Sequence, residues 1–352
     1  FALVAVSALA TVAVSTAHAQ EVRVYNWSDY IDESLLEKFT EETGIKITYD
    51  LFDSNEVLEA KLLAGGSGYD VVVPSASFLA RQIQAGVFQQ LDQSQLPNNV
   101  HLWDTIKKAT ASSDPGNAYS VNYMWGTTGI GVNINKVKEV LGEDAPVDSL
   151  ALVLDPANME KLATCGVHFL DAPVEIIPAT LAYIGEDPDS QDPDVIAKTE
   201  PVLSAIAPFV QKFHSSEYIN ALANGDICVA VGWSGDILQA RDRAAEADNG
   251  VEIEYYAPKE GALMWFDNMA IPVDAPNPEA AHKFLNFIMD AQNMAAASNY
   301  VYYANGNEAS QEFLAEDVIG DTAIYPDAAT LDNLYTTSPY GPKVQRVVTR
   351  MW

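Results

Sequence analysis

The stretch VRVYNWSDY, residues 22–30, decides the fold: a short strand runs directly into a loop that holds two aromatic rings and a carboxylate. Residues 45–51 alternate apolar and polar positions and predict a second strand, and DVVVP at residues 70–74 predicts a third. Leucines at helical spacing separate these strands. The order is therefore β-α-β-α-β, an α/β fold. Because right-handed crossovers make such strands parallel, we expect ligands beyond their carboxyl ends.

The segment WGTTGIGVN, residues 125–133, is extended and punctuated by glycine, and it predicts a place where the chain crosses between two lobes. A second set of elements follows. Strands are predicted at residues 167–170 and 228–233, and helices at residues 175–184 and 280–289.

Carboxylates beside aromatic rings recur along the chain. Asp29 lies between Trp27 and Tyr30, and the same pairing occurs in Trp233 with Asp236 and in Trp265 and Phe266 with Asp267. Such groups suit an organic cation, because a carboxylate binds an ammonium by charge-assisted hydrogen bonds and each aromatic face adds roughly 0.5–2 kcal/mol. One such pair alone is more commonly a packing ring beside a solvated acid. Their joint arrangement predicts a binding site, to which Glu175 also belongs.

The charge balance narrows the partners. The 352 residues include 19 Lys and Arg against 49 Asp and Glu, a formal net charge of −30. Such acidity argues against nucleic-acid binding and favours cationic partners or a saline habitat.

Residues 1–19 predict a secretory signal. They contain an uncharged apolar run and the cleavage pattern Ala17-His18-Ala19, without the initiator Met and basic region that normally precede them, so we expect a truncated signal. No later run is long enough to span a bilayer. We therefore expect an exported, soluble mature protein.

Two cysteines occur, Cys165 and Cys228. An even pair in an exported chain favours one disulfide, which would contribute about 4 kcal/mol by restricting the unfolded chain. Two buried free thiols are the alternative.

Motifs for catalysis are weak. The histidines lack zinc-binding spacing, Gly232-Trp233-Ser234-Gly235 lacks the final glycine of a nucleophile elbow, and no phosphate-binding loop or dinucleotide motif occurs. We therefore expect no cofactor, no metal and no catalytic residue. The serious alternative is a secreted carbohydrate-active hydrolase that uses Glu175 and Asp236 as its carboxylate pair.

From about residue 21 to its end, the chain resembles the polyamine-binding proteins of bacterial ABC importers, and most closely their putrescine-binding branch. The segments that carry this resemblance are residues 24–30, 52–56, 73–78, 213–216, 222–228 and 258–261. The resemblance implies a type II periplasmic binding fold, in which two α/β lobes close on a linear polycation, and it also supports the disulfide. The boundaries that we predict are residues 20–124 and 248–302 for lobe 1 and residues 125–247 and 303–352 for lobe 2.

The resemblance also implies a ligand site. Asp29 and Asp267, with Ser28 and Ser75 nearby, would bind one ammonium group, and Asp236 and Glu175 the other. The aromatic walls would be Trp27, Tyr30, Trp233, Trp265 and Tyr303.

One position departs from the putrescine-binding branch. Trp265 stands where that branch usually carries Phe, as in spermidine-preferring relatives, whereas Ser77 and Ala172 resemble the putrescine branch. The resemblance implies putrescine first and spermidine as a close second. It further implies a non-enzymatic, monomeric receptor in the periplasm that delivers its ligand to a membrane permease. The family's basic C-terminal tail is missing, so we expect an incomplete terminus.

Overall fold

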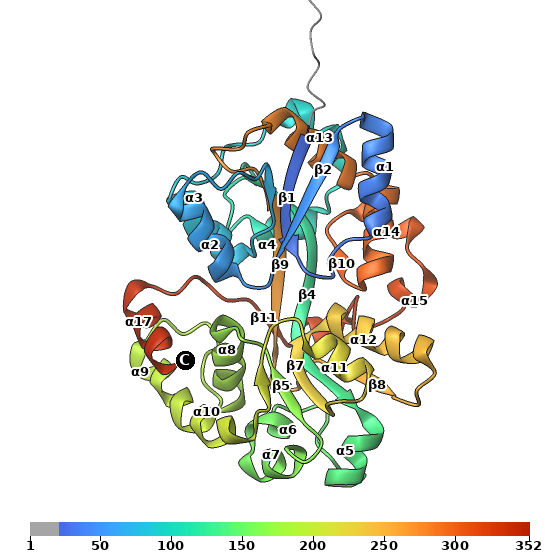
Figure 1. Cartoon of the computed structure of the whole chain (residues 1–352). Coiled ribbons are helices and arrows are strands. Elements are labelled where there is room, and N and C mark those ends of the chain that lie inside the picture. The colour runs from blue at the N-terminus through green and yellow to red at the C-terminus, as the bar shows by residue number, and fades with distance from the viewer. Residues whose placement is uncertain (1–20) are drawn as a thin grey trace, which may run out of the picture.

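The computed structural model describes residues 21–352, which form two lobes stacked along one axis (Figure 1). The predicted signal segment lies outside the described residues. One continuous 11-stranded sheet passes through both lobes. Eight of its strands follow the order β2-β1-β3-β9-β4-β7-β5-β6, and the other three lie off this path, with β8 and β10 paired to β4 and β11 paired to β9. Two long strands, β4 (Ser120–Asn133) and β9 (Ala262–Ala270), run side by side from one lobe into the other. The expected two-lobed α/β fold is thus confirmed.

The upper lobe of Figure 1 contains the predicted β-α-β-α-β unit. Its parallel strands are β1 (Glu21–Trp27), β2 (Lys46–Phe52) and β3 (Val71–Val72), with β1 between the other two. The connecting helices are α1 (Glu33–Thr43) and α2 (Asn55–Ala64), which begin where the side chains of Asp32 and Ser54 accept backbone N–H groups. Helix α3 (Ala76–Gln84) follows β3. All three parallel strands therefore end facing the lower lobe.

The lower lobe also contains three parallel strands, β5 (Val167–Phe169), β7 (Val229–Trp233) and β6 (Lys212–Phe213). Strand β5 lies between the other two and is parallel to both. Helix α8 (Pro173–Tyr183) follows β5, and helix α12 (Ser234–Ala247) follows β7. The predicted disulfide joins Cys165 to Cys228, two residues whose Cα atoms lie 5.5 Å apart just before these strands. Both helices thus begin at strand ends that face the upper lobe.

The crossing strands hold the lobes together. The antiparallel pair β4 and β9 matches Ser120 with Ala270 at one end and Thr128 with Leu263 at the other. The far end of β4 pairs with β7 and with β8 (Ile253–Tyr256), and every residue of β4 is buried. The predicted lobe boundaries stay a prediction. Strand β8 lies within the range predicted for lobe 1, yet its residue Ile253 packs in the core of the lower lobe.

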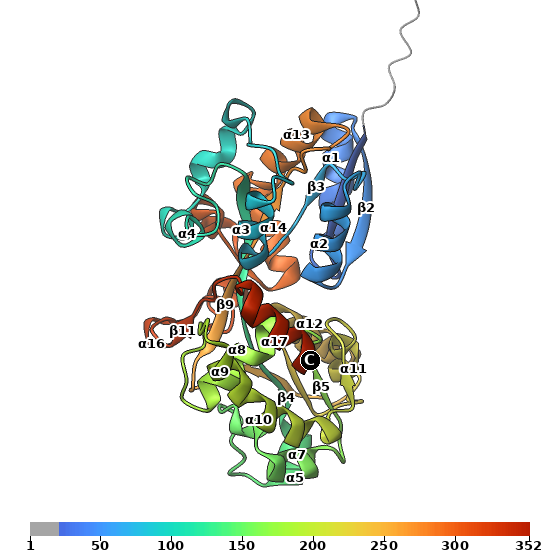
Figure 2. The same cartoon turned by 90° about the vertical axis from the view of Figure 1, so that its left-hand side faces the viewer.

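The remaining elements cover the sheet on both sides and fill the C-terminal region (Figure 2). The last helix, α17 (Pro342–Met351), lies against α8 and against α9 (Pro193–Ile196) of the lower lobe, where Val344 and Val348 pack on Ile177 and Ile196. Within residues 21–352, no helix has both the length and the apolar character needed to cross a bilayer. The remaining helices and strands that cover the sheet are α4 (Asp104–Thr110), β10 (Ala304–Asn305), α5 (Ile134–Leu141), α6 (Ala151–Leu154), α7 (Pro156–Leu162), α9 (Pro193–Ile196), α10 (Glu200–Ile206), α11 (Tyr218–Ala223), α13 (Pro278–Ile288), α14 (Ala291–Val301), α15 (Glu316–Ile319), α16 (Ala328–Leu331), β11 (Leu334–Tyr335) and α17 (Pro342–Met351).

Candidate functional site

One cavity between the lobes is lined by ten of the eleven predicted binding residues. The cavity is narrow, because the centres of water-sized molecules can occupy only about 30 Å³ of it. Its walls come from the loop after β1, the starts of α3, α8 and α12, and strand β9. The predicted residues that line it are Trp27, Ser28, Tyr30, Ser75, Glu175, Trp233, Asp236, Trp265, Asp267 and Tyr303.

The carboxylate of Asp267, on β9, faces the upper lobe. The Ser75 hydroxyl donates to its Oδ1 at 2.6 Å, and the Tyr30 hydroxyl donates to its Oδ2 at 2.9 Å. Burial raises the pKa of Asp267 to about 7, although both hydrogen bonds pull in the opposite direction. The group is therefore poised to ionise fully when a cation arrives.

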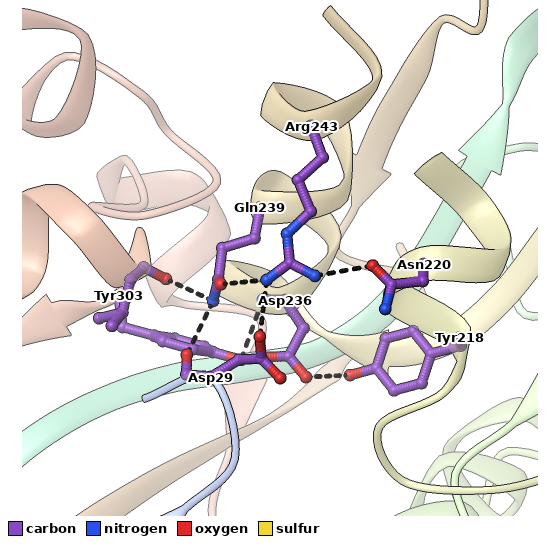
Figure 3. Close-up of polar contacts among 8 residues, drawn as sticks. Asp29, Tyr218, Asn220, Asp236, Gln239, Arg243 and Tyr303 are labelled. Carbon is purple, nitrogen blue, oxygen red and sulfur yellow. Dashed lines mark hydrogen bonds and ion pairs between the residues drawn. The ribbon is translucent and has the colours of Figure 1, made fainter. Parts of the chain in front are cut away.

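The carboxylate of Asp236 lies in the first turn of α12, where the helix dipole favours a negative charge (Figure 3). The hydroxyls of Tyr218 and Tyr303 donate to its two oxygens, each at 2.7 Å. Burial nevertheless raises the pKa of Asp236 to about 7. This second carboxylate is thus also held by neutral donors.

Glu175 supplies the third carboxyl group, from the first turn of α8. The Thr128 hydroxyl, on crossing strand β4, donates to its Oε2. Desolvation by the surrounding protein raises the pKa of Glu175 to about 7, and the negative charge of Asp267 adds to the rise. The lower lobe therefore contributes two acids to the cavity, Glu175 and Asp236, and strand β9 contributes one, Asp267.

Aromatic rings enclose the space between these acids. Trp27 and Trp233 meet edge to face with centroids 5.6 Å apart, and Tyr303 lies 5.2 Å from both Tyr30 and Trp265. The Trp27 indole is held in place because its Nε1–H donates to the Val73 carbonyl at 2.9 Å. Such walls suit a slender apolar chain with charged groups.

Within residues 21–352, Glu175, Asp236 and Asp267 form no salt bridge, although the more distant charge of Arg243 acts to lower the pKa of Asp236. In the part of the chain that the structure describes, the lining of this cavity contains three of the acids just described, together with Asp53, and no lysine, arginine or histidine. Buried carboxylates without a cationic partner are costly, so the geometry calls for a cation supplied from outside the protein.

Comparisons with known proteins agree with this geometry. Residues 34–326 match the family model for bacterial extracellular solute-binding proteins. The chain belongs to this family. This solute-binding protein is 54% identical to a putrescine-binding periplasmic protein of Pseudomonas aeruginosa, over 94% of its own length and 90% of that protein. It is 50% identical to a putrescine-binding periplasmic protein of Escherichia coli, over 98% and 94% of the two chains.

Solved structures of related proteins show the same fold. A spermidine/putrescine ABC transporter substrate-binding protein from Streptococcus pneumoniae superposes with a TM-score of 0.75, at 29% identity, over 94% of this chain and 97% of that one. The solute-binding protein therefore has the expected type II periplasmic binding fold. Its relatives are receptors and not enzymes, so the alternative of a carbohydrate-active hydrolase using Glu175 and Asp236 is wrong.

Asp29 is the one predicted binding residue that does not line this cavity. Its backbone has a φ of 53°, in the left-handed region, and its carboxylate pairs with the guanidinium of Arg243 at 2.7 Å (Figure 3). The turn carries Ser28 and Tyr30 into the cavity and leaves Asp29 facing α12. The side chain thus joins two protein segments and is not among the groups that surround the cavity.

Three further lining residues of the solute-binding protein were missed as site residues: Asp53, Asn55 and Ser215. Their signal was present, since they lie within residues 52–56 and 213–216, two of the segments on which the family resemblance rests. Asp53 directly follows Phe52, so the pairing of an acid with an aromatic ring that marks the other acids occurs here too.

Proposed function

We propose that this solute-binding protein captures a linear polyamine in the periplasm, putrescine first and spermidine as a close second. Closure of the two lobes holds the ligand, and the closed form delivers it to the membrane permease of an ABC importer. The protein acts as a monomer.

The observation that carries this proposal is the narrow aromatic cavity whose buried acids have no basic partner within residues 21–352. A diamine presents two primary ammonium groups, each with three donors, so it needs about six acceptors. Asp236, Asp267 and Glu175 offer six carboxylate oxygens. An aliphatic chain between the two ammonium groups would contact the rings of the walls.

The cavity shape supports a slender ligand over a ring. Space for the centres of water-sized molecules is about 30 Å³, which suits a few ordered waters or a methylene chain. A second cavity of about 260 Å³ shares Asn55, Ser75, Glu175 and Trp265 with the first. Space beside the ligand is therefore present for a longer polyamine, in keeping with spermidine as the second choice.

The relatives support the same class of ligand. Two of them, at 54% and 50% identity, are named putrescine-binding periplasmic proteins, and the pneumococcal structure is named as the substrate-binding protein of an ABC transporter. The location in the periplasm and the permease partner are inferred from these names.

Isothermal titration of the purified mature protein with putrescine, cadaverine, spermidine and spermine tests the proposal. We expect putrescine or spermidine to bind with a Kd near or below a micromolar, about −8 kcal/mol. Glucose, glutamate and γ-aminobutyrate serve as comparison ligands. Heat from one of these, with none from any polyamine, would contradict the assignment.

A further inference from the structure

Ser75 occupies a position where a serine normally caps a helix. It is the residue before α3, yet its hydroxyl makes no capping hydrogen bond to that helix and donates to Asp267 at 2.6 Å instead. A serine at this position usually stabilises the helix by accepting a hydrogen bond from one of its first backbone N–H groups. The hydroxyl is therefore diverted from its usual structural role toward the candidate ligand site.

Asn55, a buried residue at the start of α2, makes two hydrogen bonds to Ser75. Its Oδ1 accepts from the Ser75 backbone N–H at 3.1 Å, and its Nδ2 donates to the Ser75 hydroxyl oxygen at 3.0 Å. A backbone N–H can only donate, so the oxygen of the amide must face it. The nitrogen must then face the hydroxyl, which fixes the orientation of the Asn55 amide.

The direction of the Ser75 proton follows from this orientation. Because the hydroxyl oxygen accepts from Asn55, its own hydrogen points away from Asn55 and toward Asp267. We propose that Asn55 is a positioning residue, which acts through Ser75 to orient the Asp267 carboxylate and to favour its ionised form for a ligand ammonium. The identity of the ligand in this inference rests on the proposed function. The relay, by which we mean the hydrogen bonds from Asn55 to Ser75 and from Ser75 to Asp267, rests on the observed hydrogen bonds alone.

The same arrangement exists at Asp236, where the backbone provides it. The hydroxyl of Tyr218 accepts from the Trp233 N–H and that of Tyr303 accepts from the Asp236 N–H, both at 3.1 Å, while each donates to the carboxylate. The hydroxyls of Ser75 at Asp267 and of Tyr218 and Tyr303 at Asp236 therefore all have their direction set by an N–H group. Asn55 is thus the side chain that does at Asp267 what the main chain does at Asp236.

A double-mutant cycle tests whether Asn55 acts through Ser75. Asn55→Leu and Ser75→Ala should each weaken putrescine binding by about tenfold, the size expected for one hydrogen bond to a charged group. In the Ser75→Ala background, Asn55→Leu should change the Kd by less than about threefold. The matched control combines Asn55→Leu with Tyr218→Phe, on the other lobe, where the effects should add. Additive effects of Asn55→Leu and Ser75→Ala would overturn the proposal.

Asn55→Asp keeps an acceptor for the Ser75 N–H and a good residue for a helix start, but it removes the donor to the hydroxyl. We expect this variant to bind putrescine about tenfold more weakly, because the serine proton turns to the new carboxylate. A simple charge effect predicts the opposite, since an added acid would attract a dication. Equal or tighter binding by Asn55→Asp would contradict the relay, and this variant serves if Asn55→Leu fails to fold.

A ligand-independent measurement separates this inference from the proposed function. Carbon-13 NMR titration of the Asp267 carboxyl in the ligand-free protein should show its pKa raised by about 0.5–1 unit in Asn55→Leu, because the Ser75 hydroxyl is no longer held in the direction that donates to the ionised carboxylate. An unchanged Asp267 pKa would overturn the relay whether or not putrescine binds. Absence of putrescine binding to the unmodified protein, together with the shift, would contradict only the proposed function.

Discussion

Arg243 of helix α12 and Asp29 of the loop after β1 form an ion pair of 2.7 Å that joins the two lobes beside the candidate ligand site (Figure 3). The guanidinium also donates to Asn220 Oδ1 at 2.9 Å, and Gln239 Nε2 donates to the Asp29 carbonyl at 3.2 Å. Two residues of α12 therefore hold the same turn of the upper lobe. Since neither side chain of the ion pair lines the cavity, this contact joins the lobes from outside the candidate ligand site.

Breaking this pair should speed ligand release. We expect Asp29→Asn or Arg243→Gln to weaken putrescine binding by about two- to fivefold, mainly through faster dissociation, because a half-exposed pair contributes up to about 1 kcal/mol. Stopped-flow fluorescence measures both rates. Arg241→Gln is the matched control, since Arg241 is on the same helix and pairs with Asp321 at 2.8 Å. A slower association with unchanged dissociation would contradict the role in closure.

The sequence could not reveal this role for Asp29. Its neighbours Trp27 and Tyr30 do line the cavity, so local pattern placed the acid with them. The direction of the Asp29 side chain depends on its own left-handed φ of 53° and on the ion pair with Arg243, which lies 214 positions later in the chain. Neither a single backbone angle nor a partner that distant leaves a trace in local hydrophobic periodicity.

Much of the fold could be predicted because its signals are local. The strands and helices of residues 21–73 follow from apolar alternation and helix caps, and parallel crossovers then fix where their ends meet. The relay from Asn55 through Ser75 to Asp267 could not be predicted, since Ser75 and Asp267 are 192 positions apart. The antiparallel pairing of β9 with β3, which continues as a bridge between Asp267 and Ser75, brings them together, and that pairing is set by tertiary contacts.

Asp267 should be essential for tight binding. We expect Asp267→Asn to weaken putrescine binding by more than about tenfold, because truncating one member of a desolvated charge pair costs roughly 2–5 kcal/mol. Calorimetry measures the loss, and thermal unfolding verifies the fold. Asp104→Asn, at an exposed position on α4, is the control and should leave the Kd within threefold. Affinity of Asp267→Asn within threefold of the parent would show that this acid does not contact the ligand.

Binding should release protons near pH 7. Burial raises the pKa values of Glu175, Asp236 and Asp267 to about 7, so part of each group is protonated in the empty cavity. A bound ammonium favours the ionised forms. Acidification below pH 7 should therefore weaken putrescine binding, by about tenfold per pH unit for each proton that must leave. Calorimetry at pH 7 in phosphate and Tris, whose ionisation enthalpies differ, counts the protons.

The same pKa values predict how stability depends on pH. A carboxyl whose pKa is raised in the folded state contributes stability at low pH, and this contribution is lost as pH rises through about 7. Asp267→Asn should therefore show a smaller loss of thermal stability between pH 5 and pH 7.5 than the parent, without ligand. Equal losses in the two proteins would show that Asp267 titrates normally.

Ligand should draw the lobes together. Asp267 is held by Ser75 and Tyr30 of the upper lobe, whereas Glu175 and Asp236 begin helices of the lower lobe, so only the closed form presents all three to one ligand. Small-angle scattering should give a smaller radius of gyration with saturating putrescine than without it. Asp267→Asn at the same putrescine concentration is the control, with a smaller change. A constant radius in the parent would count against closure.

The Trp265 indole lies across the glycine that faces it on the neighbouring strand. Gly126 is the partner of Trp265 in the β4–β9 pairing, and a Cβ atom there would come within 2.7 Å of the indole Cζ2. This close approach needs glycine at that position. The wide ring thereby reaches Tyr303 at 5.2 Å between centroids and borders both the narrow cavity and the larger one beside it.

Trp265→Phe should shift preference toward putrescine relative to spermidine, because the wider indole covers more of a longer chain and offers the stronger face to a secondary ammonium. We expect the ratio of spermidine affinity to putrescine affinity to fall by about threefold or more, on the order of 0.7 kcal/mol. Competition binding of the two ligands measures it. Trp352→Phe makes the same replacement outside the narrow cavity and should leave the ratio unchanged. If the ratio does not fall in Trp265→Phe, this ring is a tolerated wall, and the choice of ligand length is made by other residues of the two cavities.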